Sequence, residues 1–208
     1  GSFYTKHFAV EHLLDKSLEK AIDDHFKFLD SLGELEASEA FFDFKVADIA
    51  MGSGHFLVAA VDRIESRFSN YLSQRNLPEV LRELSHLRKS AKEALGEAAN
   101  SYPEFEDNSL LRRQIARRCI YGADINEVAV QLARVALWIH TFVPGLPLSL
   151  LERNLVHGNS LAGVGRLSEF EEKISEDEGE NFFSINVQDY IGDAGEALLR
   201  IRKISEAT

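Results

Sequence analysis

The pattern of apolar and polar positions along the chain predicts helices that alternate with short buried strands. Apolar residues recur every three or four positions over residues 8–29, which predicts an amphipathic helix lying on a core. After a polar stretch, the run at residues 41–49 has the length and composition of a buried strand. Gly52 and Gly54 break this strand, and the apolar segment from His55 onward predicts a helix. The order is therefore strand, glycine turn, helix.

The second half of the chain repeats this alternation. Pro78 opens an amphipathic helix, and residues 110–118 are helical after a loop at residues 100–108. Residues 119–124 predict a second short strand, and residues 154–157 predict a third. Between these strands, Asn126 can cap a helix. One apolar line of that helix contains Val128, Leu132, Val135 and Ile139.

Strands that alternate with helices predict an α/β fold with a parallel sheet covered by helices on both faces. Residues 1–168 form the predicted domain, with a helical insertion at about residues 62–118 between the first two strands. Residues 169–208 are predicted to be an acidic linker and tail that lead to a missing catalytic half. Ligands of such sheets bind at the carboxyl ends of the strands.

Composition narrows the class of protein. The 208 residues are 45% hydrophobic, which allows a real core and excludes disordered and fibrous classes. The sequence shows neither a long apolar span nor a basic leader, and its single Cys119 cannot form an internal disulfide, so a soluble, cytoplasmic protein is expected. The chain opens with Gly-Ser rather than Met, which indicates processing or excision from a longer protein.

The net charge of −11 argues against a surface that binds nucleic acid throughout. The charge is uneven: residues 1–50 carry −6 (5 basic, 11 acidic) and residues 169–180 carry −6 (1 basic, 7 acidic). Only residues 62–118 are net positive, at +2 (11 basic, 9 acidic). The arginine cluster at the end of that segment is either a phosphate contact or, by the preferred interpretation, a solvated helix end. This cluster contains Arg112, Arg113, Arg117 and Arg118.

The glycine turn that follows Asp48 is the first candidate binding site. Gly52 and Gly54 let backbone approach a ligand, and the amino terminus of the next helix favours a negative group. A plain tight turn is an equally weighted alternative. A dinucleotide fingerprint would need a third glycine where Leu57 stands, and the chain contains no phosphate-loop motif.

Polar residues also end the other two strands. Asp124 can accept both hydroxyls of a ribose, or it can be a capping or surface aspartate. Asn159 and Ser160 can bind the edge of a purine, or they can form a simple turn. The coincidence of polar residues at three strand ends is the main functional signal.

Four segments, in order, resemble the cofactor-binding motifs of adenine-specific DNA methyltransferases, of the large restriction–modification and phage-defence type. These segments are residues 1–5, residues 48–57, residues 120–126 through 137–139, and residues 154–161. The resemblance covers about residues 1–165. It implies a partial three-layer Rossmann-like methyltransferase sheet that binds S-adenosylmethionine, with DNA as the partner of the full-length protein and with no membrane and no metal.

The resemblance also implies roles for particular residues. Tyr4 and Thr5 fall in the amino-terminal cofactor motif. Asp48 and the turn through Gly54 surround the methionine part of the cofactor. Asp124 binds the ribose, Ile125 lies on the adenine ring, and Asn159 with Ser160 lies near the adenine edge. The cofactor-binding set as a whole is Tyr4, Thr5, Asp48, Ala50, Met51, Gly52, Gly54, Phe56, Asp124, Ile125, Asn159 and Ser160.

The chain departs from the family's pattern at three places. Ile49 and Met51 stand where proline and cysteine are usual, and Lys6 stands where proline usually follows the tyrosine–threonine pair. The family transfers the methyl group with an Asn or Asp-Pro-Pro-aromatic motif that binds the flipped adenine, but none of the four prolines here are adjacent. The chain therefore carries no catalytic residue, and we expect it to be inactive alone.

Three rival interpretations remain at this point. The first is a methyltransferase that acts on RNA or protein, since every matching motif concerns the cofactor. The second is a non-catalytic scaffold with a methyltransferase-like fold. A nicotinamide dehydrogenase is a distant third because of Leu57. His55 is taken as a local hydrogen-bonding residue, since methyl transfer from a sulfonium needs no base there.

Overall fold

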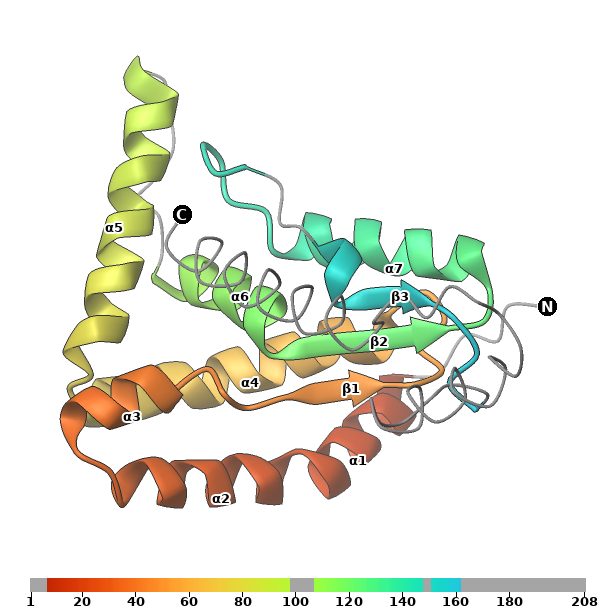
Figure 1. Cartoon of the computed structure of the whole chain (residues 1–208), viewed down its shortest axis with the longest axis horizontal. Helices are drawn as coiled ribbons and strands as arrows, with labels where there is room; N and C mark the ends of the chain where they lie inside the picture. The colour runs from red at the N-terminus through yellow and green to blue at the C-terminus, as the bar shows by residue number, and fades with distance from the viewer. Residues whose placement is uncertain (1–6, 98–106, 148–150, 162–208) are drawn as a thin grey trace, which may run out of the picture. The chain divides into compact units, whose positions relative to one another are not determined.

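The computed structural model describes residues 7–97, 107–147 and 151–161 of the chain (Figure 1). The elements, in order, are α1 (His7–Ser17), α2 (Glu19–Asp30), α3 (Glu34–Ala40), β1 (Val46–Asp48), α4 (His55–Gln74), α5 (Pro78–Leu95), α6 (Asp107–Arg118), β2 (Ile120–Asp124), α7 (Glu127–His140), the 3-10 turn η2 (Leu151–Arg153) and β3 (Leu155–His157). All of them belong to one unit, residues 1–161, which we describe by itself. The predicted linker and tail at residues 169–208 lie outside the described residues.

The three strands form one parallel sheet in the order β1-β2-β3. Val46 pairs with Ile120, Gly122 pairs with Leu155, and Asp124 pairs with His157. Because the strands run the same way, their carboxyl ends meet at one edge of the sheet (Figure 1). The α/β class and the parallel sheet predicted from the sequence are confirmed.

The two faces of the sheet differ in burial. Leu155 and Val46 are buried, and Leu57 from α4 lies beneath Gly122 on this same face. On the other face Ala47 and Val156 are exposed. Helices were predicted on both faces, but at these described positions they cover only one.

Three local predictions need correction, and one helix is longer than its apolar start. The predicted helix over residues 8–29 is two helices that meet at Leu18. The polar stretch before the first strand is the helix α3, which buries Ala37 and whose Glu36 carboxylate accepts a hydrogen bond from the Gly33 N–H (3.4 Å). The strand predicted over residues 41–49 is limited to β1, because the phenylalanines that precede β1 pack into the core instead. Finally, the helix predicted from His55 onward is α4, which continues unbroken to Gln74 and so extends into the segment predicted as a helical insertion.

Aromatic side chains fill the core between α2, α4 and the segment before β1. Phe41, Phe42 and Phe68 are almost fully buried, and the Phe41 and Phe68 ring centroids lie 4.7 Å apart. Cys119 is also buried in front of β2, and burial raises the pKa of its thiol to about 12. The thiol is therefore protonated and unreactive at neutral pH.

Helix α7 has two apolar lines, and the shorter one faces the core. Val130, Ala133 and Leu137 are buried. The line singled out in the sequence is exposed instead, with Leu132 at 53% and Ile139 at 64%. Asn126 caps the helix as predicted, its Oδ1 accepting a hydrogen bond from the Val128 N–H (3.0 Å).

A matched pair of alanine substitutions should separate the two lines of α7. Leu137→Ala is expected to lower the free energy of unfolding by about 2–5 kcal/mol, because it leaves a cavity in the core. Leu132→Ala is expected to change it by less than about 0.5 kcal/mol, as for other exposed positions. Urea denaturation of both variants measures the difference, and equal losses would contradict this orientation of α7.

Candidate functional site

The glycine turn joins the end of β1 to the amino terminus of α4. Gly52 and Gly54 have φ angles of +54° and +82°, in the left-handed region that favours glycine. The Ala50 N–H donates to Asp48 Oδ1 (3.0 Å), and the Gly54 N–H donates to the Met51 carbonyl (2.9 Å). The turn is thus closed by local hydrogen bonds, and Gly54 is the N-cap residue of α4.

Asp124 ties the end of β2 to this turn. Its Oδ2 accepts from the Gly52 N–H (2.8 Å), and its Oδ1 accepts from the Asn126 N–H (2.8 Å). A carboxylate has about four lone-pair positions, so these two bonds orient the group and leave capacity for further donors. The side chain is half-buried, which holds the carboxylate in place while one side faces solvent.

The turn after β3 lies beside Asp124. The Gly158 N–H donates to the Asp124 carbonyl (3.0 Å), and the His157 ring bonds the Ile125 carbonyl through Nε2 (3.0 Å). Asn159 Oδ1 accepts from the Leu161 N–H (3.0 Å), which closes a short side-chain turn. The three strand ends are therefore linked through Asp124 by hydrogen bonds.

The predicted site residues that the structure describes occupy different surroundings. Ile125, Asn159, Ser160 and Ala50 are exposed; Asp48, Gly52, Phe56 and Asp124 are intermediate; Met51 and Gly54 are buried. Tyr4 and Thr5 lie outside the described residues. The polar strand ends thus meet at one edge of the sheet, as the sequence led us to expect.

Met51 has a packing role in this structure. Its side chain is buried, and a Cβ added to Gly122 would lie 2.3 Å from its Sδ. Its N–H donates to the Ala123 carbonyl (3.1 Å), while its own carbonyl accepts from Gly54. A side chain at Gly122 of β2 would displace the Met51 thioether and crowd Leu57, which lie against the same face of the sheet.

Two further residues position the site, and sequence reasoning missed both. Ala133 of α7 lies against Gly54, whose added Cβ would come within 3.0 Å of the alanine Cβ and 3.2 Å of its Cα. Arg134 donates from Nη2 to the Leu155 carbonyl (2.6 Å), which fastens α7 to β3. The sequence contains one signal for such contacts, the small residues along α7. It did not identify which residues elsewhere in the chain they would contact.

The arginines at the end of α6 contact other parts of the protein. Arg112 pairs with Glu65 (3.1 Å), and Arg118 pairs with Glu83 (3.4 Å) while its guanidinium lies over the Phe42 ring. Arg113 is buried, donates to the Pro147 carbonyl, and has its pKa lowered to about 10 by that burial. The phosphate-contact interpretation loses support, because at least these three side chains have internal roles.

The described ranges contain neither a metal-binding cluster nor a membrane-spanning helix. Residues 7–97, 107–147 and 151–161 contain no group of three or more His, Cys, Asp or Glu side chains that could hold a metal ion. None of the helices described here is long and apolar enough to cross a membrane.

Comparison with known proteins gives one significant curated match. The chain is similar to a Methanocaldococcus jannaschii protein named "Putative type II restriction enzyme and methyltransferase", with 26% identity over 166 residues. The match covers 74% of this chain but 11% of that protein, so the chain spans about a tenth of the relative's length. No family model matches the chain. No solved structure matches it significantly. The similarity supports, weakly, a relationship to restriction–modification methyltransferases.

Proposed function

We propose that this chain is the S-adenosylmethionine-binding part of a restriction–modification DNA methyltransferase with adenine as its target base. Its three strands would then be part of a three-layer Rossmann-like sheet. The observation that carries the proposal is the Asp124 carboxylate, which is held by the Gly52 and Asn126 N–H groups at the edge where the three strands end. A pre-oriented carboxylate at this place suits a ribose.

The chemistry of S-adenosylmethionine matches the groups available at this edge. The cofactor has an ammonium, a carboxylate, a ribose and a purine, but no pyrophosphate that would call for a third glycine. Asp48 offers a carboxylate to the ammonium, and the amino terminus of α4 favours the cofactor's carboxylate. The exposed Ile125 offers an apolar surface to the adenine ring, and Asn159 offers an amide to its edge.

Methyl transfer itself would depend on residues outside this chain. The sequence lacks a Pro-Pro motif, and the similar Methanocaldococcus jannaschii protein is about nine times longer than the matched part. In the whole protein, the amine of an adenine flipped out of the duplex would attack the methyl group in line with the carbon–sulfur bond, which would break to release the demethylated cofactor and a proton from the amine. The cofactor would supply the reactive methyl, and the groups at the sheet edge would bind and orient it.

The proposal is tested by calorimetric titration of the purified chain with S-adenosylmethionine and with its demethylated product. Both are expected to bind, and NAD is expected not to bind. Gly52→Val is expected to abolish binding, because a β-branched residue is strained at positive φ and the N–H that holds Asp124 would move. Gly96→Val, at a glycine with the same φ of +54° at the end of α5 and outside the proposed site, is the control.

Two results would argue against this function. Failure of the folded wild-type chain to bind either compound would favour a scaffold role. Binding of NAD in their place would favour a dehydrogenase. If cofactor binding is found, methylation assays of the full-length protein on adenine-containing DNA, RNA and protein then identify the substrate class.

A further inference from the structure

The imidazole of His157 supplies a hydrogen bond at the point where the sheet ends. His157 is the last residue of β3 and pairs with Asp124, the last residue of β2. The next backbone bond runs from the Gly158 N–H to the Asp124 carbonyl (3.0 Å). Beyond it, β2 leads into α7, whose N-cap is Asn126. The next carbonyl, that of Ile125, is reached by the side chain of His157, whose Nε2 lies 3.0 Å from the oxygen.

The direction of this bond follows from the chemistry of its two groups. A carbonyl oxygen only accepts, so Nε2 of His157 carries the hydrogen and donates it. Ile125 precedes the N-cap of α7, and the Asn126 carbonyl already accepts from the Val130 N–H (3.1 Å) as the first bond of that helix. The imidazole therefore bonds an acceptor that the helix itself does not use.

The peptide group that His157 holds is also the one that orients Asp124. The Ile125 carbonyl and the Asn126 N–H belong to one planar trans peptide, so they point in opposite directions. The carbonyl accepts from His157, and the N–H donates to Asp124 Oδ1 (2.8 Å). Fixing one end of the peptide therefore fixes the direction of the other. Hydrogen bonds in such a chain also polarise one another, so the imidazole strengthens the bond to the carboxylate.

The two oxygens of the Asp124 carboxylate differ in what supports them. Oδ2 accepts from the Gly52 N–H, which lies in a turn closed by its own hydrogen bonds. Oδ1 accepts from the Asn126 N–H only two residues away, and this local contact lasts only while the peptide keeps its orientation. The capping side chain of Asn126 restrains the peptide on the side of α7, and His157 restrains it on the side of β3. Loss of the imidazole should therefore let the peptide turn and release Oδ1.

We propose that His157 is a positioning residue for the ribose of S-adenosylmethionine, because its imidazole holds the peptide group between Ile125 and Asn126, whose N–H aims the Asp124 carboxylate. This inference rests on the proposed function. It assigns His157 no contact with the cofactor. The effect passes through two hydrogen bonds between described residues at the ends of β2 and β3.

Loss of the imidazole should disturb this orientation more than the stability of the fold. The His157 side chain is exposed, so water can replace its hydrogen bond at little net cost in free energy. A mobile water does not hold the peptide in one direction. Variants at this position are therefore expected to fold, with urea midpoints close to that of the wild-type chain.

His157→Phe and His157→Gln test the donor at this position. Phenylalanine keeps a ring and removes the donor, whereas glutamine keeps an N–H donor on a side chain of similar length. His157→Phe is expected to weaken binding of the demethylated cofactor about fivefold, as for one lost hydrogen bond. His157→Gln is expected to restore most of this affinity. Calorimetric titration measures both.

His140→Phe is the matched control. Nε2 of His140 also bonds a group on another element, since it lies 2.7 Å from Asp62 Oδ1 of α4. His140 is the last residue of α7, about 20 Å along the helix from Glu127 at the sheet edge. The substitution removes a hydrogen bond of the same kind and should leave the affinity unchanged.

Two further measurements separate positioning from a general loss of structure. His157→Phe should narrow the preference for the demethylated cofactor over its 2′-deoxy analogue, because the affected carboxylate binds the ribose hydroxyls. A general loss of structure would weaken both ligands equally. Without cofactor, hydrogen exchange of the Asn126 amide, followed by NMR, should be faster in His157→Phe than in the wild-type chain or in His140→Phe.

Each outcome supports or overturns the inference. Equal losses of affinity in His157→Phe and His140→Phe would overturn it, as would a glutamine variant that binds as weakly as the phenylalanine variant. Faster exchange at Asn126 with unchanged affinity would also overturn it and leave the contact purely structural. If the wild-type chain binds neither S-adenosylmethionine nor its demethylated product, the proposed function fails and the inference fails with it. Wild-type binding that His157→Phe does not alter removes the inference alone.

Discussion

Asp124→Ala is expected to weaken S-adenosylmethionine binding at least about 100-fold. In the proposed site this carboxylate accepts hydrogen bonds from the ribose hydroxyls, and a hydrogen bond to a charged group contributes about 1.5–3 kcal/mol. Two such bonds are worth about 3 kcal/mol or more, and each 1.4 kcal/mol is about tenfold in affinity. Calorimetric titration measures the loss.

The control for this substitution is Glu127→Ala. It removes the same charge three residues along the chain, from an exposed position in the first turn of α7. Its effect on affinity should be less than about twofold. Unaltered binding by Asp124→Ala would remove Asp124 from the site.

A cofactor analogue separates direct contact from disturbance of the turn. Asp124 also accepts from the Gly52 and Asn126 N–H groups, so its loss could act through the turn. The wild-type chain should prefer the demethylated cofactor to its 2′-deoxy analogue, because a site built to bind a hydroxyl rejects a ligand that lacks it. Asp124→Ala should lose this preference if the ribose contact is direct.

The strands and turns were predictable because their signals are local. A short apolar run ended by glycines or by a carboxylate is visible within a few residues, and parallel pairing follows from alternation with helices. Asn126 was predictable as a cap for the same reason. Since parallel strands end at one edge, the proximity of Asp124 to the glycine turn also followed from the pattern.

The orientation of α7 was not predictable from periodicity alone. Both of its lines, one through Leu132 and the other through Leu137, keep helical spacing. The structure buries the second, because it contains Ala133, and only a small residue permits the close approach of Gly54. Which line of α7 is buried therefore depends on a contact between residues 79 positions apart. The sequence of α7 alone does not contain that information.

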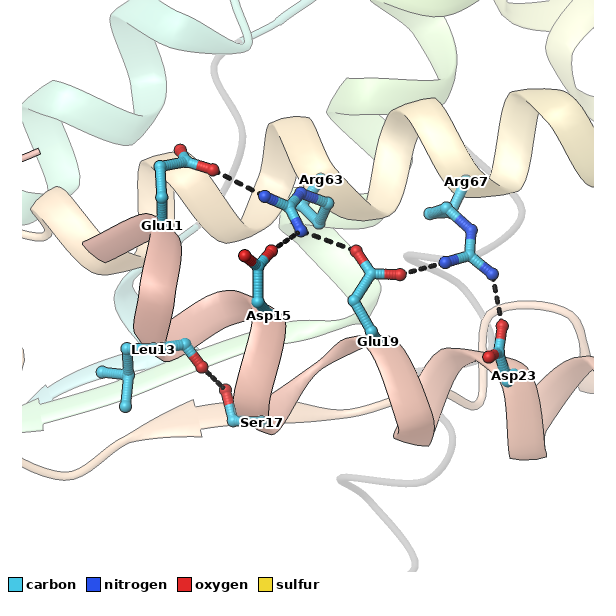
Figure 2. Close-up of polar contacts among 8 residues, drawn as sticks. All are labelled: Glu11, Leu13, Asp15, Ser17, Glu19, Asp23, Arg63 and Arg67. Atoms are coloured by element: carbon cyan, nitrogen blue, oxygen red, sulfur yellow. Dashed lines mark hydrogen bonds and ion pairs between the residues drawn. The ribbon is translucent and has the colours of Figure 1, made fainter. Parts of the chain in front are cut away.

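Long-range charge pairing explains part of the uneven charge. The acidic first fifty residues include the carboxylates at every fourth position from Glu11 to Asp23, and the basic segment after residue 61 includes Arg63 and Arg67. These groups pair across more than forty positions. The sequence left a phosphate contact open only for the arginines at residues 112–118, and the structure uses Arg63 and Arg67 to join helices (Figure 2).

Gly54→Ala is expected to destabilise the protein more than Gly52→Ala, by about 1–3 kcal/mol. Both glycines have positive φ, so each substitution incurs about 1–2 kcal/mol of backbone strain. At Gly52 an added Cβ meets no atom within 4 Å, whereas at Gly54 it comes 3.2 Å from the Cα of Ala133. That atom belongs to a helix backbone and cannot rotate away, so the cost of overpacking is added.

Urea denaturation of the two variants measures this difference, with cofactor absent. Ala133→Gly in the Gly54→Ala background should recover only part of the loss, since it removes the 3.0 Å Cβ contact but leaves the Cα at 3.2 Å. Equal destabilisation by the two glycine substitutions would mean that α7 does not press on the turn. The expected inequality would mean instead that the packing of α7 against Gly54 sets the position of the turn, and with it the Gly52 N–H that orients Asp124.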